Sequence, residues 1–329
     1  MKAILYAGAV LLSFSTVHAV DVEQPEVRTF IDEMVRDHEF DRAELVGTLK
    51  QAERKQAILD AISRPAEKTL SWAEYRRIFI TPERIEAGAD FCRENGDMLA
   101  EVAATSGVPE EILVGIIGVE TYYGRITGGY RVLDALSTLA FYYPPRAQFF
   151  RKELKQYLLL VREEEMPADQ ATGSYAGAMG LPQFMPSSFR MYAIDSTADG
   201  KRDIWNNWTD VAASIANYFN AHGWRSNQPV IAQASLGKRW HGEVPKPENT
   251  LTPQDTVRTL SDKGVLFATD LPDDSKTQLL TYEGKDGTEH WVGFHNFFVI
   301  TRYNRSVMYA LAVHQLGQEI AYALESDAS

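Results

Sequence analysis

The chain has 329 residues, of which 45% are hydrophobic and 24% are charged, proportions typical of a folded globular protein rather than a disordered or fibrous one. Its 33 Lys and Arg against 45 Asp and Glu give a formal net charge of −12. An acidic chain without a basic run is a poor candidate for binding nucleic acid or an anionic membrane. The single cysteine, Cys92, excludes an internal disulfide and a cysteine-based zinc site.

The first 19 residues predict an export signal. Lys2 precedes an apolar run over residues 3–12, and a polar stretch then ends in Val17-His18-Ala19, the order of a secretory signal and its cleavage site. The run is shorter than the roughly 20 residues of a transmembrane helix, and no cysteine follows it to carry a lipoprotein anchor. We therefore expect a periplasmic protein without a membrane anchor; a buried N-terminal helix is the alternative.

Helical periodicity dominates the first part of the chain. From Val22 to about Gly107, apolar residues recur at spacings of three and four. Thr81-Pro82-Glu83 combines a capping residue, a first-turn proline and an acidic residue, which predicts a helix start. Another helix is expected to open at Pro109. Three further helices are predicted over residues 147–165, 208–221 and 306–324.

The character of the sequence changes between Trp224 and Tyr303. Residues 229–235 favour a strand, and residues 278–282 and 290–294 flank a turn-rich segment, which predicts a hairpin. Residues 297–301 are β-branched and aromatic, so another strand is predicted there. The expected fold is mainly α (α+β), with a small β-rich insertion before the last helix.

The helix after Pro109 carries the first candidate for chemistry. One of its faces bears an apolar stripe made of Ile112, Leu113, Ile116 and Ile117. Glu120 continues this stripe. A core-facing carboxylate is costly unless it is paired or protonated, and desolvation raises its pKa, as a general acid requires. Gly124 is expected to end the helix just beyond it. The alternative is a Glu satisfied by an internal Arg or by backbone donors.

Residues 173–188 form the second candidate. This segment has three glycines and two prolines among polar and aromatic residues, which disfavours a regular helix or strand. Its glycines permit close backbone approach to a ligand. Within it, Gln183 could orient a sugar hydroxyl or acetamido group, and Phe184 could stack on a pyranose face. A tight interhelical loop is the alternative interpretation.

These segments resemble, in their order along the chain, the lytic murein transglycosylase B family. Four motifs carry the resemblance: residues 120–125 (ETYYGR), residues 173–188, residues 216–219 (ANYF) with 222–224 (HGW), and Arg302-Tyr303-Asn304. The similarity covers nearly the whole chain after the signal and is strongest over residues 116–224. Four motifs in one order make the resemblance specific.

The resemblance implies a goose-lysozyme-like helical core, an N-terminal α domain and a small inserted β domain. The corresponding boundaries are 1–19 for the signal, 20–107 for the N-terminal domain, 108–223 for the catalytic core, 224–300 for the insertion and 301–329 for the last core helix. Family members cleave the β-1,4 bond between N-acetylmuramic acid and N-acetylglucosamine and leave a 1,6-anhydro ring. The implied partners are peptidoglycan glycan strands and other cell-wall enzymes, and catalysis requires no cofactor.

The resemblance also assigns residues. Glu120 would be the only catalytic acid/base. The glycan groove would be lined by Ser174, Gln183, Phe184, Tyr218, Tyr303 and Asn304. Arg146 matches one arginine of a pair that follows Tyr-Pro in the family, whereas Pro145 stands at the other position.

A single carboxyl is chemically sufficient for this reaction. Most glycosidases use two carboxylates, but no second acid accompanies Glu120 in the four motifs. Glu120 alone suffices if the N-acetyl group stabilises C1 and the sugar's own 6-hydroxyl attacks. A distant Asp acting as a base would instead give hydrolysis. A lysozyme-like muramidase and an inactive peptidoglycan-binding scaffold therefore stay open as alternatives.

Residues 195–206 resemble a calcium-binding EF-hand loop. Asp195, Thr197 and Asp199 occupy positions one, three and five, and Gly200 occupies position six. Position twelve is Asn206, where a bidentate Glu belongs. In the family a later aspartate, matching Asp210, closes the loop over residues 195–210, and Lys201 would contribute its carbonyl. We expect a weak structural Ca²⁺ site; an Asp/Gly-rich turn without metal is the alternative.

Overall fold

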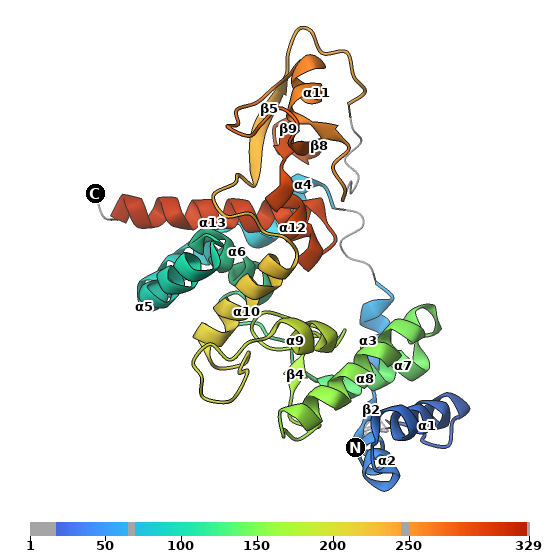
Figure 1. The fold of residues 1–329 in the computed structure, drawn as a ribbon. Helices are drawn as coiled ribbons and strands as arrows, with labels where there is room; N and C mark the ends of the chain where they lie inside the picture. Colours follow the sequence, from blue (N-terminus) through green and yellow to red (C-terminus); the bar gives the residue numbers. More distant parts are fainter. Residues whose placement is uncertain (1–17, 65–69, 245–250, 328–329) are drawn as a thin grey trace, which may run out of the picture.

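The computed structural model describes residues 18–64, 70–244 and 251–327 (Figure 1). The predicted signal at residues 1–19 therefore lies outside the described residues except for its last two. His18–Ala19 form strand β1, which pairs antiparallel with β2 (Glu53–Arg54). Val20, directly after β1, is buried.

Helices make up most of the described chain, as predicted. Their bounds are α1 Pro25–His38, α2 Arg42–Gln51, α3 Gln56–Ile62, α4 Trp72–Phe79, α5 Pro82–Ser106, α6 Glu110–Thr121, α7 Val132–Tyr142, α8 Ala147–Glu163, α9 Pro186–Tyr192, α10 Trp208–Ala221, α11 Val257–Asp262, α12 His295–Tyr303 and α13 Val307–Asp327. The predicted capping is confirmed at α5, where the Thr81 side chain accepts a hydrogen bond from the Arg84 amide and Pro82 is the first helical residue. Pro109 immediately precedes α6.

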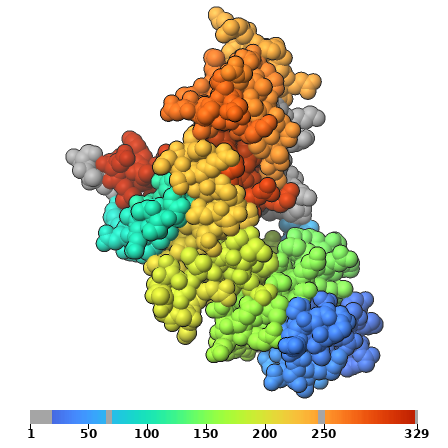
Figure 2. Space-filling model, in the orientation of Figure 1, coloured from blue at the N-terminus to red at the C-terminus, as the bar shows by residue number. Residues whose placement is uncertain are grey.

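The molecule is elongated. Figures 1 and 2 show the β-rich part at one end and helices α1 and α2 at the other. Helix α13 crosses the region between these ends and packs against both α5 and α6. No single helix in the described residues is long and apolar enough to span a membrane; one sharply bent pair, α5 with α6, meets the length and composition criteria.

Close packing of α6 against α13 sets the geometry of the candidate site. A Cβ on Gly115 would lie 2.4 Å from the Val313 carbonyl oxygen, and one on Gly317 would lie 2.1 Å from the Glu111 carbonyl oxygen. Only glycine permits such an approach at these two positions. The two contacts run in opposite directions along the helices, so α6 and α13 are antiparallel. The end of α6 therefore faces the start of α13.

The β-rich part is a five-stranded antiparallel sheet in the order β6-β8-β9-β5-β7. Its strands are β5 Ile231–Leu236, β6 Asp255–Thr256, β7 Val265–Leu266, β8 Lys276–Gly284 and β9 Gly287–Gly293. The predicted hairpin is confirmed, because β8 and β9 pair up to Gly284 and Gly287 at its tip. The sheet and α11 enclose a small core of their own, made of Val257, Leu260, Val265, Leu279, Val292 and Phe294.

The strand predicted over residues 297–301 is wrong, since these residues lie inside α12. Phe297, Val299 and Ile300 are all buried and join the main core. A fully buried apolar run does not distinguish strand from helix by periodicity, and tertiary packing overrides the β propensity of its residues.

Candidate active site

Glu120 occupies the last turn of α6, where the backbone is strained. The helix ends at Thr121, three residues before the predicted end at Gly124. The reason is that Tyr122 and Tyr123 adopt left-handed conformations, with φ of 52° and 55°. Residues other than glycine rarely take positive φ, and such conformations persist only where the surroundings enforce them.

Packing of the two tyrosine rings holds this turn in place. The Arg84 and Arg125 guanidinium groups lie 4.5 and 4.9 Å from the centre of the Tyr122 ring. Tyr123 is buried and stacks on Phe91, with ring centroids 5.6 Å apart. The Glu120 carboxyl is thus carried by a short segment whose rings are anchored to α5.

Tyr309, near the start of α13, contacts the carboxyl directly. Its hydroxyl donates a hydrogen bond to Glu120 Oε1 at 2.6 Å. Burial, and then the charge of Glu120, raises the pKa of the Tyr309 hydroxyl well above its usual range, so this group keeps its proton. Burial and the charge of Glu120 likewise raise the pKa of Tyr303. Glu120 itself is half-buried, which agrees with the expectation that its carboxyl lies near a helix end rather than deep within the protein.

The segment over residues 173–185 folds into turns around two side chains predicted to bind glycan. Ser174 Oγ accepts hydrogen bonds from the amides of Ala176 and Ala178, at 3.3 and 3.1 Å. Gln183 has a φ of 52°, and its Nε2 donates to the carbonyls of Thr127 and Gly180, at 3.1 and 2.8 Å. The orientation of the Gln183 amide is therefore fixed by the backbone before any ligand binds.

Two hydrogen bonds tie this segment to the helices beside it. The buried Thr121 hydroxyl, one residue after Glu120, donates to the Leu181 carbonyl at 3.2 Å. The Tyr303 hydroxyl donates to the Pro182 carbonyl at 2.6 Å. The ends of α6 and α12 and the turns of residues 173–185, far apart in the sequence, thus meet around Glu120.

Phe184 takes a different position from the one predicted. Its side chain is only 2% exposed and packs against the rings of Tyr218 and Tyr303, with centroids 5.9 and 5.8 Å apart. A ring covered in this way is unavailable to stack on a sugar, so Phe184 supports the site from beneath. Tyr218 is also buried, and its hydroxyl donates to the Arg302 carbonyl at 2.6 Å.

The other two predicted substrate residues lie at element ends. Asn304 directly follows Tyr303 and has an extended backbone. Arg146 is exposed at the end of a short 3₁₀ helix, Pro144–Arg146, and its guanidinium lies 4.4 Å from the Phe149 ring centre. Its described contacts are with this ring and that of Phe150, on α8.

Hydrogen bonds to the backbone organise the EF-hand-like loop. Asp195 accepts from the amides of Asp199 and Gly200, at 3.2 and 2.7 Å. Asp210, fully buried in the first turn of α10, accepts from three loop amides with both of its oxygens. The residues at positions 3, 5 and 7 also take part: Thr197 Oγ1 accepts from Asn207, and Asp199 Oδ1 accepts from the Lys201 amide.

These loop oxygens are of the type that calcium prefers, but in the described residues no three acidic, His or Cys side chains are grouped so that they could hold an ion. A carboxylate has about four acceptor positions, so amide hydrogen bonds do not exhaust its capacity. The oxygen atoms of the loop are therefore suitable ligands for a cation. In the structure, however, the Asp210 carboxylate accepts hydrogen bonds from loop amides.

Comparison with known proteins identifies the class of enzyme. Residues 22–318 match the family described as Transglycosylase SLT domain. The chain therefore belongs to this family and is a lytic transglycosylase, an enzyme that acts on peptidoglycan.

Its relatives are similar along nearly their whole length. The chain is 40% identical over 308 residues to membrane-bound lytic murein transglycosylase B of Escherichia coli (strain K12), covering 91% of this chain and 83% of the relative. The structure of catenated lytic transglycosylase SltB1 from Pseudomonas aeruginosa has 50% identity and a TM-score of 0.86, covering 91% of this chain and 98% of that one.

Two further structures contain ligands. Slt35 of Escherichia coli in complex with calcium has 40% identity and a TM-score of 0.83, covering 94% of this chain and 97% of that one. SltB3 of Pseudomonas aeruginosa in complex with NAG-anhNAM-pentapeptide has 29% identity and a TM-score of 0.79, covering 91% of this chain and 80% of that one.

The sequence did not predict a role for Tyr309, because this residue lies 189 residues from Glu120 and belongs to none of the four motifs.

Proposed function

We propose that Glu120 is the single acid/base with which this transglycosylase cleaves the MurNAc-β-1,4-GlcNAc bond and forms a 1,6-anhydro end. The observation that carries this proposal is the half-buried Glu120 carboxyl, held by the Tyr309 hydroxyl at 2.6 Å on a strained helix end. The complex of SltB3 with an anhydro-muropeptide supports the product assignment.

In the proposed reaction, the Glu120 carboxyl donates its proton to the glycosidic oxygen as the C1–O bond breaks. The N-acetyl group stabilises C1, and the Glu120 carboxylate then accepts the proton of the 6-hydroxyl as O6 bonds to C1. No water is consumed. Tyr309 positions the carboxyl and does not supply the proton, because its raised pKa keeps it protonated.

We propose that the glycan contacts are made by the residues that the family resemblance assigns to the groove: Ser174, Gln183, Tyr218, Tyr303 and Asn304. Gln183 is best prepared for this role, because its amide is already fixed by two backbone carbonyls. Phe184 supports the Tyr218 and Tyr303 rings. Arg146, exposed on the surface, is proposed to contact a part of the substrate farther from the cleaved bond.

Digestion of purified sacculi, followed by mass spectrometry of the products, tests the proposed reaction. The purified protein should release fragments with anhydro ends, and Glu120→Gln should release them about 10²–10⁴-fold more slowly. Reducing ends would indicate a muramidase that uses water. Absence of cleavage by the wild-type protein would indicate a peptidoglycan-binding scaffold.

We further propose that residues 195–210 bind a structural Ca²⁺ through the side chains of Asp195, Thr197, Asp199 and Asp210 and the Lys201 carbonyl. The calcium complex of Slt35 and the oxygen-rich loop support this proposal. Binding would require Asp210 to exchange some of its backbone amide partners for the ion. Catalysis is proposed to need no cofactor, because Glu120 alone transfers both protons.

We propose periplasmic localisation after cleavage behind Ala19, where the chain meets peptidoglycan glycan strands and other cell-wall enzymes. Cleavage there would remove β1 and turn the Val20 nitrogen, which donates to the Ala52 carbonyl at 2.9 Å, into the new α-amino group, which is still a hydrogen-bond donor. N-terminal sequencing of the exported protein should therefore begin at Val20. An uncleaved N-terminus, or the protein found in the cytoplasmic fraction, would contradict this proposal.

A further inference from the structure

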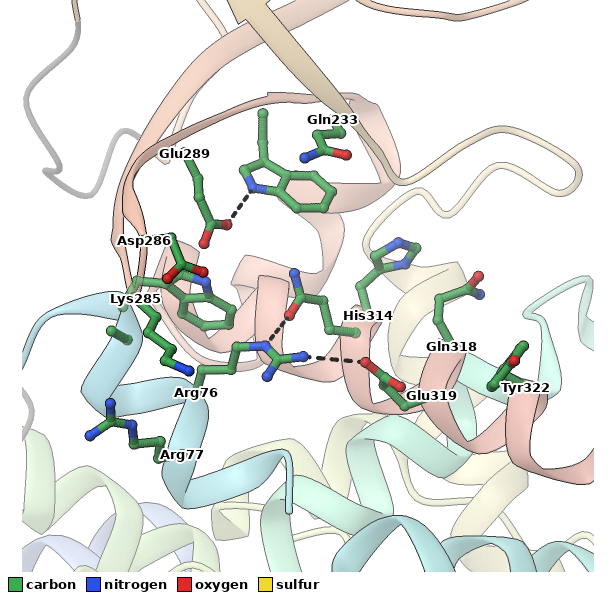
Figure 3. A pocket seen from close by; sticks show the side chains of 14 residues that line it. Arg76, Arg77, Gln233, Lys285, Asp286, Glu289, His314, Gln318, Glu319 and Tyr322 are labelled. Carbon is green, nitrogen blue, oxygen red and sulfur yellow. Dashed lines mark hydrogen bonds and ion pairs between the residues drawn. The ribbon is translucent and has the colours of Figure 1, made fainter. Parts of the chain in front are cut away.

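A pocket of about 760 Å³ lies between α4, α13 and the β8–β9 hairpin (Figure 3). This volume is within the range of roughly 300–1,000 Å³ that is usual for small-ligand sites. Its walls come from elements far apart in the sequence: α4 contributes Arg76, the hairpin Glu289 and Trp291, and α13 His314 and Tyr322. None of these residues belongs to the four motifs around Glu120.

The pocket is separate from the catalytic carboxyl, although both use α13. Tyr309 contacts Glu120 at the start of this helix, whereas the pocket begins at His314 and extends to Tyr322. With a rise of 1.5 Å per residue, these positions lie about 8 and 20 Å along the helix from Tyr309. Figure 3 shows Gln318, Glu319 and Tyr322 following one another along this helix, away from His314.

The charges that line the pocket cancel. Its cationic and acidic side chains are equal in number: Arg76, Arg77, Lys285, Asp286, Glu289 and Glu319. Arg76 is paired with Glu319 at 3.2 Å and donates to Gln315 at 2.9 Å. Burial lowers the pKa of His314 to about 4, so this side chain is neutral at pH 7. A lining of this kind suits a ligand that is polar and uncharged.

Aromatic surfaces and amides complete the lining. Trp291 donates its indole N–H to Glu289 at 3.2 Å, which fixes the ring, and Tyr322 is an aromatic residue with an unusual 70% exposure. Gln233, Gln315 and Gln318 add side-chain amides, each with donors and an acceptor. Aromatic faces pack against the C–H faces of sugar rings, while amides bond to hydroxyl and acetamido groups.

Two lining residues also carry polar atoms without a partner. In the part of the chain that the structure describes, Trp72 Nε1 and His314 Nδ1 are buried and make no hydrogen bond. Buried polar groups are nearly always satisfied, and leaving them unsatisfied costs free energy. Both atoms belong to residues that line the pocket, so they are the lining groups that most lack a hydrogen-bond partner.

We propose that this pocket is a second glycan-binding site, which takes uncharged N-acetylhexosamine units such as the GlcNAc residues of a neighbouring peptidoglycan strand. It would hold the enzyme on its polymeric substrate while Glu120 acts elsewhere. The proposal is independent of the role assigned to Glu120, because it concerns binding at residues outside the catalytic machinery.

Isothermal titration calorimetry with N,N′,N″-triacetylchitotriose tests the site. The wild-type protein should bind this probe at two sites, one in the catalytic groove and one in the pocket. Tyr322→Ala should weaken only the second event, by about five- to tenfold, because it removes one aromatic surface. Ala73→Trp, which fills the pocket from α4, should abolish the second event. Ile78→Trp is the matched control, since Ile78 lies on the same helix, is 49% exposed and does not line the pocket.

Three results would overturn the proposal: one binding event in the wild-type protein, two unchanged events in both pocket variants, or loss of the second event in Ile78→Trp as well. Binding of a free stem pentapeptide that Tyr322→Ala weakens, without binding of the sugar probe, would assign the pocket to peptide instead. Anhydro-product formation from short soluble fragments should be unchanged in Tyr322→Ala, so failure here is distinguishable from failure of the Glu120 proposal.

Discussion

At the scale of single residues, the proposed site combines a carboxyl and a hydroxyl from two helices that are 189 residues apart in the sequence. Glu120 lies on a helix end that two left-handed tyrosines hold in place, and Tyr309 donates to its Oε1. The hydroxyl cannot act as an acid because its pKa is too high, whereas the carboxyl is chemically suited to both proton transfers.

The Glu120→Gln substitution separates chemistry from folding. The amide has nearly the same shape and still accepts the Tyr309 hydrogen bond, so the melting temperature should stay close to that of the wild-type protein. Cleavage of sacculi should fall by about 10²–10⁴-fold, the usual contribution of a general acid/base. Substantial cleavage by the purified variant would refute the assignment.

The Tyr309→Phe substitution tests positioning. Loss of a hydrogen bond to a charged group should lower kcat about ten- to a hundredfold, with little change in KM. Because the pKa of Tyr309 lies well above its usual range, the hydroxyl is protonated throughout the working range and adds no titration of its own to the pH dependence of kcat. Loss of its hydrogen bond to the Glu120 carboxylate should favour the protonated Glu120 carboxyl, so the pH profile of the variant should keep its shape and move to higher pH. An unchanged kcat, or the loss of a titration step from the variant's profile, would contradict the positioning role.

At the scale of elements, the antiparallel contact between α6 and α13 sets the distance between those two residues. At Gly115 and at Gly317, a backbone carbonyl of the facing helix occupies the space that a side chain would otherwise fill. The loop from Asp195 to Asp210 has a comparable role at the start of α10, where the buried Asp210 joins loop and helix.

The Gly317→Ala substitution should force the two helices apart, because its Cβ would lie 2.1 Å from the Glu111 carbonyl oxygen. We expect the free energy of unfolding to fall by about 1–3 kcal/mol, together with a lower kcat from the displaced Tyr309. Denaturant unfolding measures the first effect. Gly47→Ala is the control: Gly47 lies in α2 with no atom within 4 Å of its added Cβ, so this change should be neutral or stabilising. Equal destabilisation by both would contradict the packing argument.

Calcium should stabilise the loop over residues 195–210. With Asn206 at the twelfth position, we expect a Kd near the 10⁻⁴–10⁻³ M of weak extracellular sites, and a gain of about 2.7 kcal/mol at a hundredfold excess over Kd. Millimolar calcium should raise the Tm of the wild-type protein. Asp199→Ala should cancel this rise and leave activity at low temperature largely intact. If calcium does not change the wild-type Tm, or shifts the variant equally, the loop is only a turn.

At the scale of the whole molecule, the β-rich part is joined to the helical core through α4, α12 and α13, and the second pocket lies at this junction. The partly buried His314 lies there as well, and its ionisation is linked to global stability. Its pKa falls from 6.5 to about 4 on folding, because burial disfavours the charged ring.

Between about pH 4 and 6.5 the unfolded chain therefore binds more protons at His314 than the folded protein does, so stability rises with pH in this window. The contribution of His314 is fully present above pH 6.5 and is lost as the pH falls towards 4, by about 1–3 kcal/mol. His314→Gln should flatten the pH dependence of the unfolding free energy there. An identical pH dependence in both proteins would show that His314 is accessible to protons when folded.

Short-range features of the sequence were sufficient to predict most helices and the β8–β9 hairpin. Caps and first-turn prolines act within one turn, so the starts of α5 and α6 could be placed, and the turn between β8 and β9 depends on four or five residues. Glu120 and residues 173–188 stood out because an acid on an apolar stripe and a cluster of glycines are unusual in a short window.

Only the tertiary structure decided what depends on partners distant in the chain. Residues 297–301 became helical because they are buried among other elements, and the Phe184 ring is covered by Tyr218 and Tyr303, which come from distant segments. The pairing of Tyr309 with Glu120 and the junction pocket follow from helix packing, which brings together segments more than a hundred residues apart. The periodicity of apolar residues in one segment predicts that one of its faces is buried. Which other element covers that face depends on the three-dimensional arrangement of the rest of the chain.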